Sequence, residues 1–196
     1  MSKVSTVSGR RMDLLNPVEA DIDIHDIAHG LSNICRYGGQ TNCFYSVAQH
    51  SVALSVVAPT LEHYRDPNLT DWQLTQIAKA ALLHDAAEAY TGDIKTPVKE
   101  LLPDFAERIE GPITDVIFSR YRVSTEWLSH VNPYDKQIVI NEMRQFFFTG
   151  VPLELLGREP IEGLTISPQS PEEARRWFFD RFKSLFDGEE RELRYA

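Results

Sequence analysis

Hydrophobic side chains recur at intervals of three and four residues along most of the chain, which is the spacing of helices with one buried face. Together with start and stop signals, this pattern predicts helices over residues 24–35, 46–58, 74–90, 103–121, 124–131, 134–148 and 171–188. Residues 151–169 are rich in proline and glycine and are expected to form a long loop. The expected fold class is all-α, a helical bundle to which residues 4–7 and 164–166 can add a small β ribbon.

Several of these helices carry recognisable start and stop residues. Ser46 and Thr70 are each followed three positions later by a glutamine, so side chain and backbone can exchange hydrogen bonds at the first helical turn. Pro59 is expected to end the second helix and Gly92 the third. Pro133 predicts a new helix start, because proline suits the first turn.

Composition narrows the class of protein. The 196 residues carry a formal net charge of −9 and include 42% hydrophobic and 10% aromatic residues, which predicts a single globular domain over residues 1–196. An acidic surface disfavours nucleic-acid polymers, because binding them relies on lysine and arginine neutralising phosphates. No apolar run approaches the ~18 residues that cross a bilayer. We therefore expect no membrane partner and a cytoplasmic location, in the host cytoplasm if the chain is phage-encoded.

The predicted helix over residues 74–90 carries three ionisable side chains in its most apolar part. His84, Asp85 and Glu88 lie in the run ALLHDAAEA, where burying charge is costly unless the charge is paired or bound to a metal. On a continuous helix these residues lie within about one turn, so all three can converge on one side. Imidazole and carboxylate groups are metal ligands, and a further carboxylate can handle a proton. The run indicates metal ligands beside an acid/base group, rather than a stripe of surface polar groups.

Two residues cannot fill the coordination sphere of a metal, so further ligands must come from other helices. His50 and Asp135 each lie in the first turn of a predicted helix. Each also has an ordinary explanation, His50 as a hydrogen-bonded core histidine and Asp135 as a favourable charge at a helix N-terminus. Spacing alone does not bring either residue to His84 and Asp85.

The order of these residues is nevertheless recognisable. His50, then His84 with Asp85, then Asp135, each on a predicted helix, resembles the HD superfamily of metal-dependent phosphohydrolases. The chain is similar to the branch that contains the YfbR-type deoxynucleoside 5′-monophosphatases and the phage dATP triphosphohydrolases, and the similarity covers nearly the whole chain. It implies an HD-domain helical bundle. The segments that carry it are 13–17 (DLLNP), 26–29 (DIAH), 31–39 (LSNICRYGG), 44–51 (FYSVAQHS) and 83–93 (LHDAAEAYTGD).

This resemblance implies one divalent ion held by His50, His84, Asp85 and Asp135, with positions left for water and a phosphate oxygen. Such ligands suit Co²⁺, Zn²⁺, Mn²⁺, Ni²⁺ or Fe²⁺, and Mg²⁺ can accompany a triphosphate substrate. Glu88 matches the acid/base carboxylate of the family, beside the attacking water.

Substrate contacts are implied at four positions. Arg36 matches a phosphate-binding arginine, whose guanidinium can form paired hydrogen bonds with phosphate oxygens. Tyr37 stands where an aromatic ring borders the sugar and base, with packing in the core as the alternative. Asp93 matches a carboxylate that faces the sugar or assists catalysis at the phosphate. Lys95 can reach a phosphate tail, although a solvated loop lysine is the alternative.

The resemblance predicts an enzyme that cleaves the bond beside the 5′-oxygen of a deoxynucleotide. Release of triphosphate from a deoxynucleoside triphosphate such as dATP is favoured by segments 34–39 and 44–50, which look closer to the phage branch. Release of phosphate from a monophosphate uses the same catalytic residues. The choice depends on room for two more phosphates, for which the candidate basic residues are Lys95, Lys99, Lys136 and Arg144.

A regulatory module that binds nucleotides without turnover is a further hypothesis. The presence of Glu88 beside a full set of ligands argues against it, because a pure binder has no use for an acid/base carboxylate. The family also leads us to expect a homo-oligomer.

Overall fold

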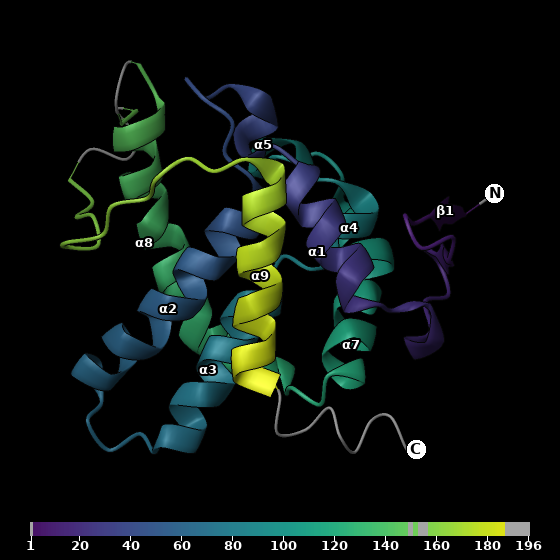
Figure 1. The fold of residues 1–196 in the computed structure, drawn as a ribbon, viewed down its shortest axis with the longest axis horizontal. Coiled ribbons are helices and arrows are strands. Elements are labelled where there is room, and N and C mark those ends of the chain that lie inside the picture. The colour runs from purple at the N-terminus through teal and green to yellow at the C-terminus, as the bar shows by residue number, and fades with distance from the viewer. Residues whose placement is uncertain (1, 149–150, 153–156, 187–196) are drawn as a thin grey trace.

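The computed structural model describes residues 2–148, 151–152 and 157–186 and shows a bundle of helices with one small ribbon (Figure 1). The longer helices are α1 (Ile24–Asn33), α2 (Val47–Arg65), α3 (Asp71–Leu83), α7 (Gly111–Arg120), α8 (Leu128–Phe146) and α9 (Pro171–Phe186). Shorter helical segments are η1 (Glu19–Asp21), η2 (Arg36–Gly39), α4 (Glu88–Thr91), α5 (Thr96–Lys99), α6 (Pro103–Phe105), η3 (Ala106–Glu110) and η4 (Thr125–Trp127). Strands β1 (Lys3–Ser5) and β2 (Arg11–Asp13) pair antiparallel. The predicted all-α class is confirmed.

Helix α9 packs against α1, α2 and α3 and closes the bundle from one side (Figure 1). Its residues Phe178 and Phe182 are fully buried in the core, together with Leu54 of α2 and Leu82 of α3. Among the described residues, no helix combines the length and the apolar character needed to span a bilayer.

The predicted start signals at Ser46 and Thr70 are confirmed. The Ser46 hydroxyl accepts from the Gln49 amide while the Gln49 side chain accepts from the Ser46 amide. Thr70 and Gln73 form the same pair of bonds at the start of α3. Both helices therefore begin directly after these caps, α3 at Asp71, three residues before its predicted range.

Helix α1 ends earlier than predicted, at Asn33. Residues 34–36 instead run beside residues 45–47, where the Arg36 amide donates to the Tyr45 carbonyl at 2.9 Å. The turn η2 follows, with Tyr37 in the left-handed region at φ 57°. These contacts place Arg36 and Tyr37 at the start of α2, rather than at the end of α1.

Helix α2 does not end before Pro59, as predicted, but continues through it to Arg65. Proline has no amide hydrogen, so the carbonyl of Ser55 loses its helical partner. Arg181 of α9 replaces that partner, because its Nη2 donates to the Ser55 carbonyl at 2.8 Å and its Nε donates to the Ser55 hydroxyl at 3.0 Å. A side chain 126 residues away thus satisfies the carbonyl that Pro59 leaves without a helical partner.

The predicted continuous helix over residues 74–90 is wrong. Helix α3 stops at Leu83, residues 84–87 form tight turns, and α4 begins at Glu88. Amide-to-carbonyl bonds to the third preceding residue, such as 2.9 Å from Ala86 to Leu83, replace the helical ones. The turn brings α4 close to α1, since a Cβ added at Gly30 of α1 would lie 2.9 Å from the Cβ of Ala89 in α4. Gly92, with φ 81°, ends α4 as predicted.

The separate helices predicted on either side of Pro133 are one helix, α8, which runs through the proline. The ring of Trp127, just before α8, contacts Trp72 of α3 edge-on at a centroid distance of 5.8 Å. This contact lies beside the first turn of α8, upstream of Pro133. Asp135 consequently lies two turns inside a helix, and not in a first turn.

The ribbon pairs other segments than predicted. Residues 3–5 pair with residues 11–13 through a tight turn in which Gly9 has φ 86°. In the predicted segment 164–166, the Ile166 amide instead donates to the Gln145 side chain at 2.9 Å. A short hairpin closes with little loss of chain entropy, which favours it over a distant partner. The predicted loop has no helix or strand in its described residues, 151–152 and 157–169, and the predicted helix over residues 103–121 is interrupted by the wide turn η3.

Candidate metal centre

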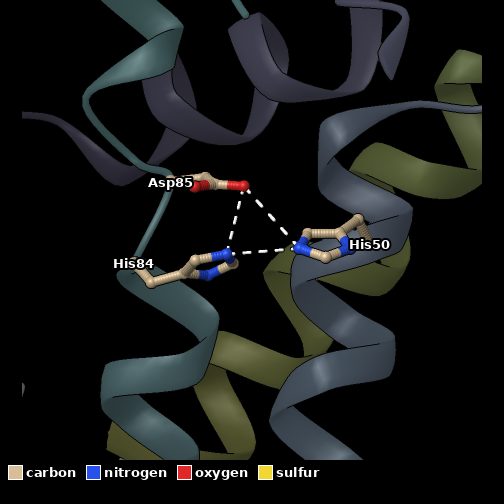
Figure 2. A group of neighbouring side chains, drawn as sticks. All are labelled: His50, His84 and Asp85. Atoms are coloured by element: carbon tan, nitrogen blue, oxygen red, sulfur yellow. Dashed lines mark hydrogen bonds and ion pairs between the residues drawn. The ribbon is translucent and has the colours of Figure 1, made fainter. Parts of the chain in front are cut away.

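Three side chains that could hold a metal converge where α2 and α3 meet, as Figure 2 shows. His50 comes from the first turn of α2, His84 follows the last residue of α3, and Asp85 is next in the chain. The Nε2 atoms of the two histidines are 3.2 Å apart. The Oδ2 atom of Asp85 lies 3.1 Å from His84 Nε2 and 3.7 Å from His50 Nε2.

Asp135 of α8 reaches the same two histidines. Its Oδ1 atom lies 3.1 Å from His50 Nε2 and 3.8 Å from His84 Nε2. The structure therefore brings together all four residues that the sequence singles out as ligands, including His50 and Asp135, which spacing could not connect to the others.

The contacts of the two Nδ1 atoms show which nitrogen of each imidazole carries the hydrogen and which carries the lone pair. His84 Nδ1 lies 2.8 Å from the Ala81 carbonyl oxygen, which can only accept, so this nitrogen carries the hydrogen. His50 Nδ1 lies 2.6 Å from a carboxylate oxygen of Glu142 and donates likewise. In the neutral imidazoles, both Nε2 lone pairs then face each other across 3.2 Å. A cation at about 2.0–2.1 Å from each nitrogen would convert this repulsion into ligation, so the residues fit a divalent metal.

The carboxylates give this centre a strong attraction for positive charge. Although burial opposes it, the Asp85 carboxylate raises the pKa of His84 to about 9. Burial also opposes ionisation of Asp85, but the neighbouring His84 holds the pKa of Asp85 well below its usual value. Near pH 7 a proton therefore occupies Nε2 of His84 when no other cation is bound.

Glu88, the predicted acid/base residue, lies in the first turn of α4 and is 4% exposed. Its Oε2 atom has no hydrogen-bond partner among the described residues, and its Oε1 atom is 3.5 Å from Lys99 Nζ. Burial, followed by the charges of Asp85 and Asp93, raises the pKa of Glu88 to about 9. Without a bound cation, the side chain is therefore a neutral acid near pH 7.

Arg36 is held over the centre by two carboxylates. Its Nη1 lies 3.4 Å from Asp85 Oδ2 and its Nη2 lies 3.3 Å from Glu142 Oε2. Its Nε is buried and has no hydrogen-bond partner among the residues that the structure describes. A buried guanidinium donor without a partner is available to an anion.

Glu142 is the residue that sequence reasoning missed. It is 0% exposed, and although burial opposes ionisation, Arg36 and His50 lower the pKa of Glu142 to about 2. It follows Asp135 by seven residues on α8, so the two lie on one face of that helix. That spacing is a signal the sequence contains, but it becomes informative only once Asp135 is known to face the centre.

A cavity of about 600 Å³ opens beside these residues. Tyr37 and Asp93 line it, as do the exposed Lys95 and Lys136. The Tyr37 ring also packs edge-on against Phe147 at a centroid distance of 5.1 Å.

The other two basic candidates, Lys99 and Arg144, are placed differently from Lys95 and Lys136. Lys99 lines the cavity but bridges Glu88 and Glu110, with 2.5 Å between its Nζ and Glu110 Oε1. Arg144 is not among the residues that line the cavity.

Comparisons with known proteins agree with this centre. A model of the YfbR-like 5′-deoxynucleotidase family matches residues 25–112, which include His50, His84, Asp85 and Glu88. The chain is also 35% identical over 189 residues to the uncharacterized protein YfdR of Escherichia coli strain K12, a match that covers 94% of this chain and 96% of YfdR. The chain belongs to the YfbR-like family of the HD superfamily. It is therefore a nucleotide phosphohydrolase, and the family implies a divalent metal.

Two other relatives match shorter parts of the chain. An uncharacterized protein of Rhodobacter capsulatus is 40% identical over 118 residues, covering 59% of this chain and 56% of the relative. The dATP triphosphohydrolase of Salmonella phage PMBT28 is 47% identical over 62 residues, covering 29% of this chain and 32% of the phage protein.

Proposed function

We propose that the chain is a deoxynucleoside 5′-phosphohydrolase whose divalent cation is held by His50, His84, Asp85 and Asp135. The observation that carries this proposal is the convergence of two imidazole Nε2 atoms and two carboxylates at 3.1–3.8 Å. When bound, the cation supplies polarisation of a phosphate oxygen and makes an adjacent water more acidic. The donor set suits Co²⁺, Zn²⁺, Mn²⁺, Ni²⁺ or Fe²⁺, with Mg²⁺ as the partner of a triphosphate.

Arg36 binds the phosphate. Its partnerless Nε can donate to one phosphate oxygen, and Nη1, now 3.4 Å from Asp85, can turn to another, while Nη2 stays with Glu142. The proposal thus assigns Arg36 to charge neutralisation and to orientation of the phosphorus towards the attacking water.

Glu88 transfers the proton. In the reaction, a water oxygen bonds to phosphorus while the bond between phosphorus and the 5′-oxygen breaks. The 5′-oxygen takes the proton that Glu88 holds, and the proton released by the water restores the Glu88 acid. Burial raises the pKa of Glu88, which supports the role of proton donor, because a carboxyl with an ordinary pKa is ionised at neutral pH.

Asp93 and Tyr37 face the nucleoside. Both line the cavity beside the cation ligands, and burial raises the pKa of Asp93. We assign Asp93 to a sugar hydroxyl or to assistance at the phosphate, and the Tyr37 ring to the sugar and base.

The substrate we propose is a deoxynucleoside triphosphate, of which dATP is the first to test. Two exposed lysines, Lys95 and Lys136, line the same cavity as Arg36, which supports room for a polyphosphate. The phage relative named dATP triphosphohydrolase also supports it. The family description, 5′-deoxynucleotidase, favours a monophosphate as the second candidate.

Product analysis decides between these substrates. The purified chain is incubated with Co²⁺, Mn²⁺, Zn²⁺ or Mg²⁺ and with deoxy- and ribonucleotide mono- and triphosphates. Triphosphate release from dATP supports the first candidate, and phosphate release from a monophosphate alone supports the second. Nucleotide binding without turnover under any of these conditions would leave only the regulatory module. A homo-oligomer, a cytoplasmic location and a single domain over residues 1–196 stay predictions from the sequence.

A further inference from the structure

The buried carboxylate of Glu142 lies between His50 and Arg36 and accepts from both. Its Oε1 atom accepts from the Tyr45 hydroxyl at 2.7 Å and from His50 Nδ1 at 2.6 Å. Its Oε2 atom accepts from the Tyr37 hydroxyl and from Arg36 Nη2 at 3.3 Å. One side chain on α8 thus contacts a candidate cation ligand and the candidate phosphate-binding arginine.

We propose that Glu142 is a positioning residue that sets the affinity for the cation and the affinity for the phosphate together. This inference rests on the proposed function, in which His50 binds the cation and Arg36 the phosphate. The bond to Nδ1 directs the Nε2 lone pair of His50 into the centre. The contact with Nη2 keeps Arg36 over the same point.

Only a carboxylate satisfies this arrangement. Four groups donate to Glu142, and an ionised carboxylate offers two oxygens with about four acceptor sites. In a Glu142→Gln variant, the amide NH₂ would meet at least one of these donors with another donor. If the amide oxygen stays with His50, the NH₂ faces Arg36, and the reverse orientation deprives His50 of its acceptor.

The chain offers a matched control in Glu62. This glutamate is also buried, at 1% exposed, and it also joins an arginine and a histidine, Arg65 at 2.9 Å and His130 at 3.2 Å. It lies on α2, twelve residues after His50, or about 18 Å along the helix axis. Glu62→Gln therefore removes a similar buried charge away from the centre.

The test measures binding without turnover. Metal-free wild type, E142Q and E62Q are titrated with Mn²⁺ by calorimetry, and inorganic phosphate is then titrated into each Mn²⁺-loaded protein. We expect E142Q to bind Mn²⁺ about 10- to 100-fold more weakly, and phosphate about 10-fold more weakly, with E62Q close to wild type in both. A folded E142Q with wild-type affinity for either ligand would overturn the inference.

A second measurement does not depend on the folding of E142Q. In Zn²⁺-loaded wild type, nitrogen-15 NMR of the histidine rings should show His50 protonated at Nδ1, with that proton far downfield and protected from exchange. A His50 protonated at Nε2 would contradict the positioning role. Failure of the proposed function looks different, because the wild type itself would then bind no Mn²⁺ or hydrolyse no nucleotide.

Discussion

The Nε2 atom of His84 lies 3.1 Å from the Oδ2 atom of Asp85, its neighbour in the chain. Adjacent side chains of a continuous α-helix point about 100° apart and do not meet. The two groups meet here because α3 ends at Leu83 and the chain turns before α4. The break in the helix thus accompanies the approach of a neighbouring histidine and aspartate, which are two candidate ligands of one centre.

Replacing Asp85 should abolish cation binding and activity together. Asp85→Ala removes a carboxylate that lies 3.1 Å from His84 and 3.7 Å from His50, and we expect Mn²⁺ affinity and kcat/KM to fall at least ~100-fold. Calorimetry and initial rates measure the two effects. Asp104→Ala, which changes an exposed aspartate of α6, is the control, and an active D85A would contradict the ligand assignment.

Replacing Glu88 should separate binding from turnover. Glu88→Gln keeps the shape of the side chain but holds no transferable acid proton, so kcat should fall by about 10²- to 10⁴-fold while Mn²⁺ affinity stays near wild type. Because Glu88 acts in its protonated form, wild-type kcat should decline as the pH rises through the pKa of Glu88. That alkaline decline should be missing in E88Q, and a near-wild-type rate would refute the role.

Removing the cavity lysines should distinguish the two substrates. Lys95→Gln and Lys136→Gln each delete a positive charge at the cavity, so KM for dATP should rise about 5- to 10-fold for each variant at low salt. KM for a deoxynucleoside monophosphate should change less than twofold, since that substrate has no distal phosphates. Equal effects on both substrates would argue against a polyphosphate subsite.

The bond from Arg181 to α2 should stabilise the fold. Arg181→Met leaves the Ser55 carbonyl without its donor, and we expect the free energy of unfolding to fall by about 1–3 kcal/mol. In a Pro59→Ala background the new amide can bond to that carbonyl, so Arg181→Met should lower the free energy of unfolding by less. Urea denaturation of the wild type, R181M, P59A and the double variant measures the coupling between Arg181 and Pro59. Equal losses of unfolding free energy in both backgrounds would contradict it.

Asp26 should make stability depend on acid pH. Burial opposes its ionisation, but hydrogen bonds from Ser8 and Thr6, at 2.6–2.9 Å, lower the pKa of Asp26 below its usual 3.8. Its stabilisation is therefore fully present above pH ~4 and is lost as the pH falls through the lowered pKa. Asp26→Asn should cost about 1–3 kcal/mol at pH 7 and much less once the pH lies below the lowered pKa of Asp26. A pH-independent cost would refute this account.

Signals in the sequence located the starts of α2 and α3 and the candidate ligands. The capping pairs at Ser46 and Thr70 involve residues three apart, so the sequence contains everything that forms them. The order of His50, His84, Asp85 and Asp135 along the chain identified the superfamily, because that order can be recognised without the structure. Such features need no knowledge of what packs against them.

Errors arose where distant contacts override local preference. Pro59 signals the end of a helix, yet Arg181 of α9 supplies the missing donor. The run around His84 has the period of one helix, yet the close contact of Gly30 with Ala89 accompanies a turn there. Glu142 escaped notice because its partners belong to three other segments of the chain.

The ligands of the proposed cation span 85 positions, from His50 to Asp135, and come from elements that meet only in the folded state. An unfolded chain has no comparable centre, so bound metal acts as a ligand of the native state alone. At a free metal concentration of 100 times Kd, this linkage would add about 2.7 kcal/mol to the free energy of unfolding. The lifetime of the enzyme in a cell would then follow metal supply, and a chelator would promote unfolding as well as inactivation.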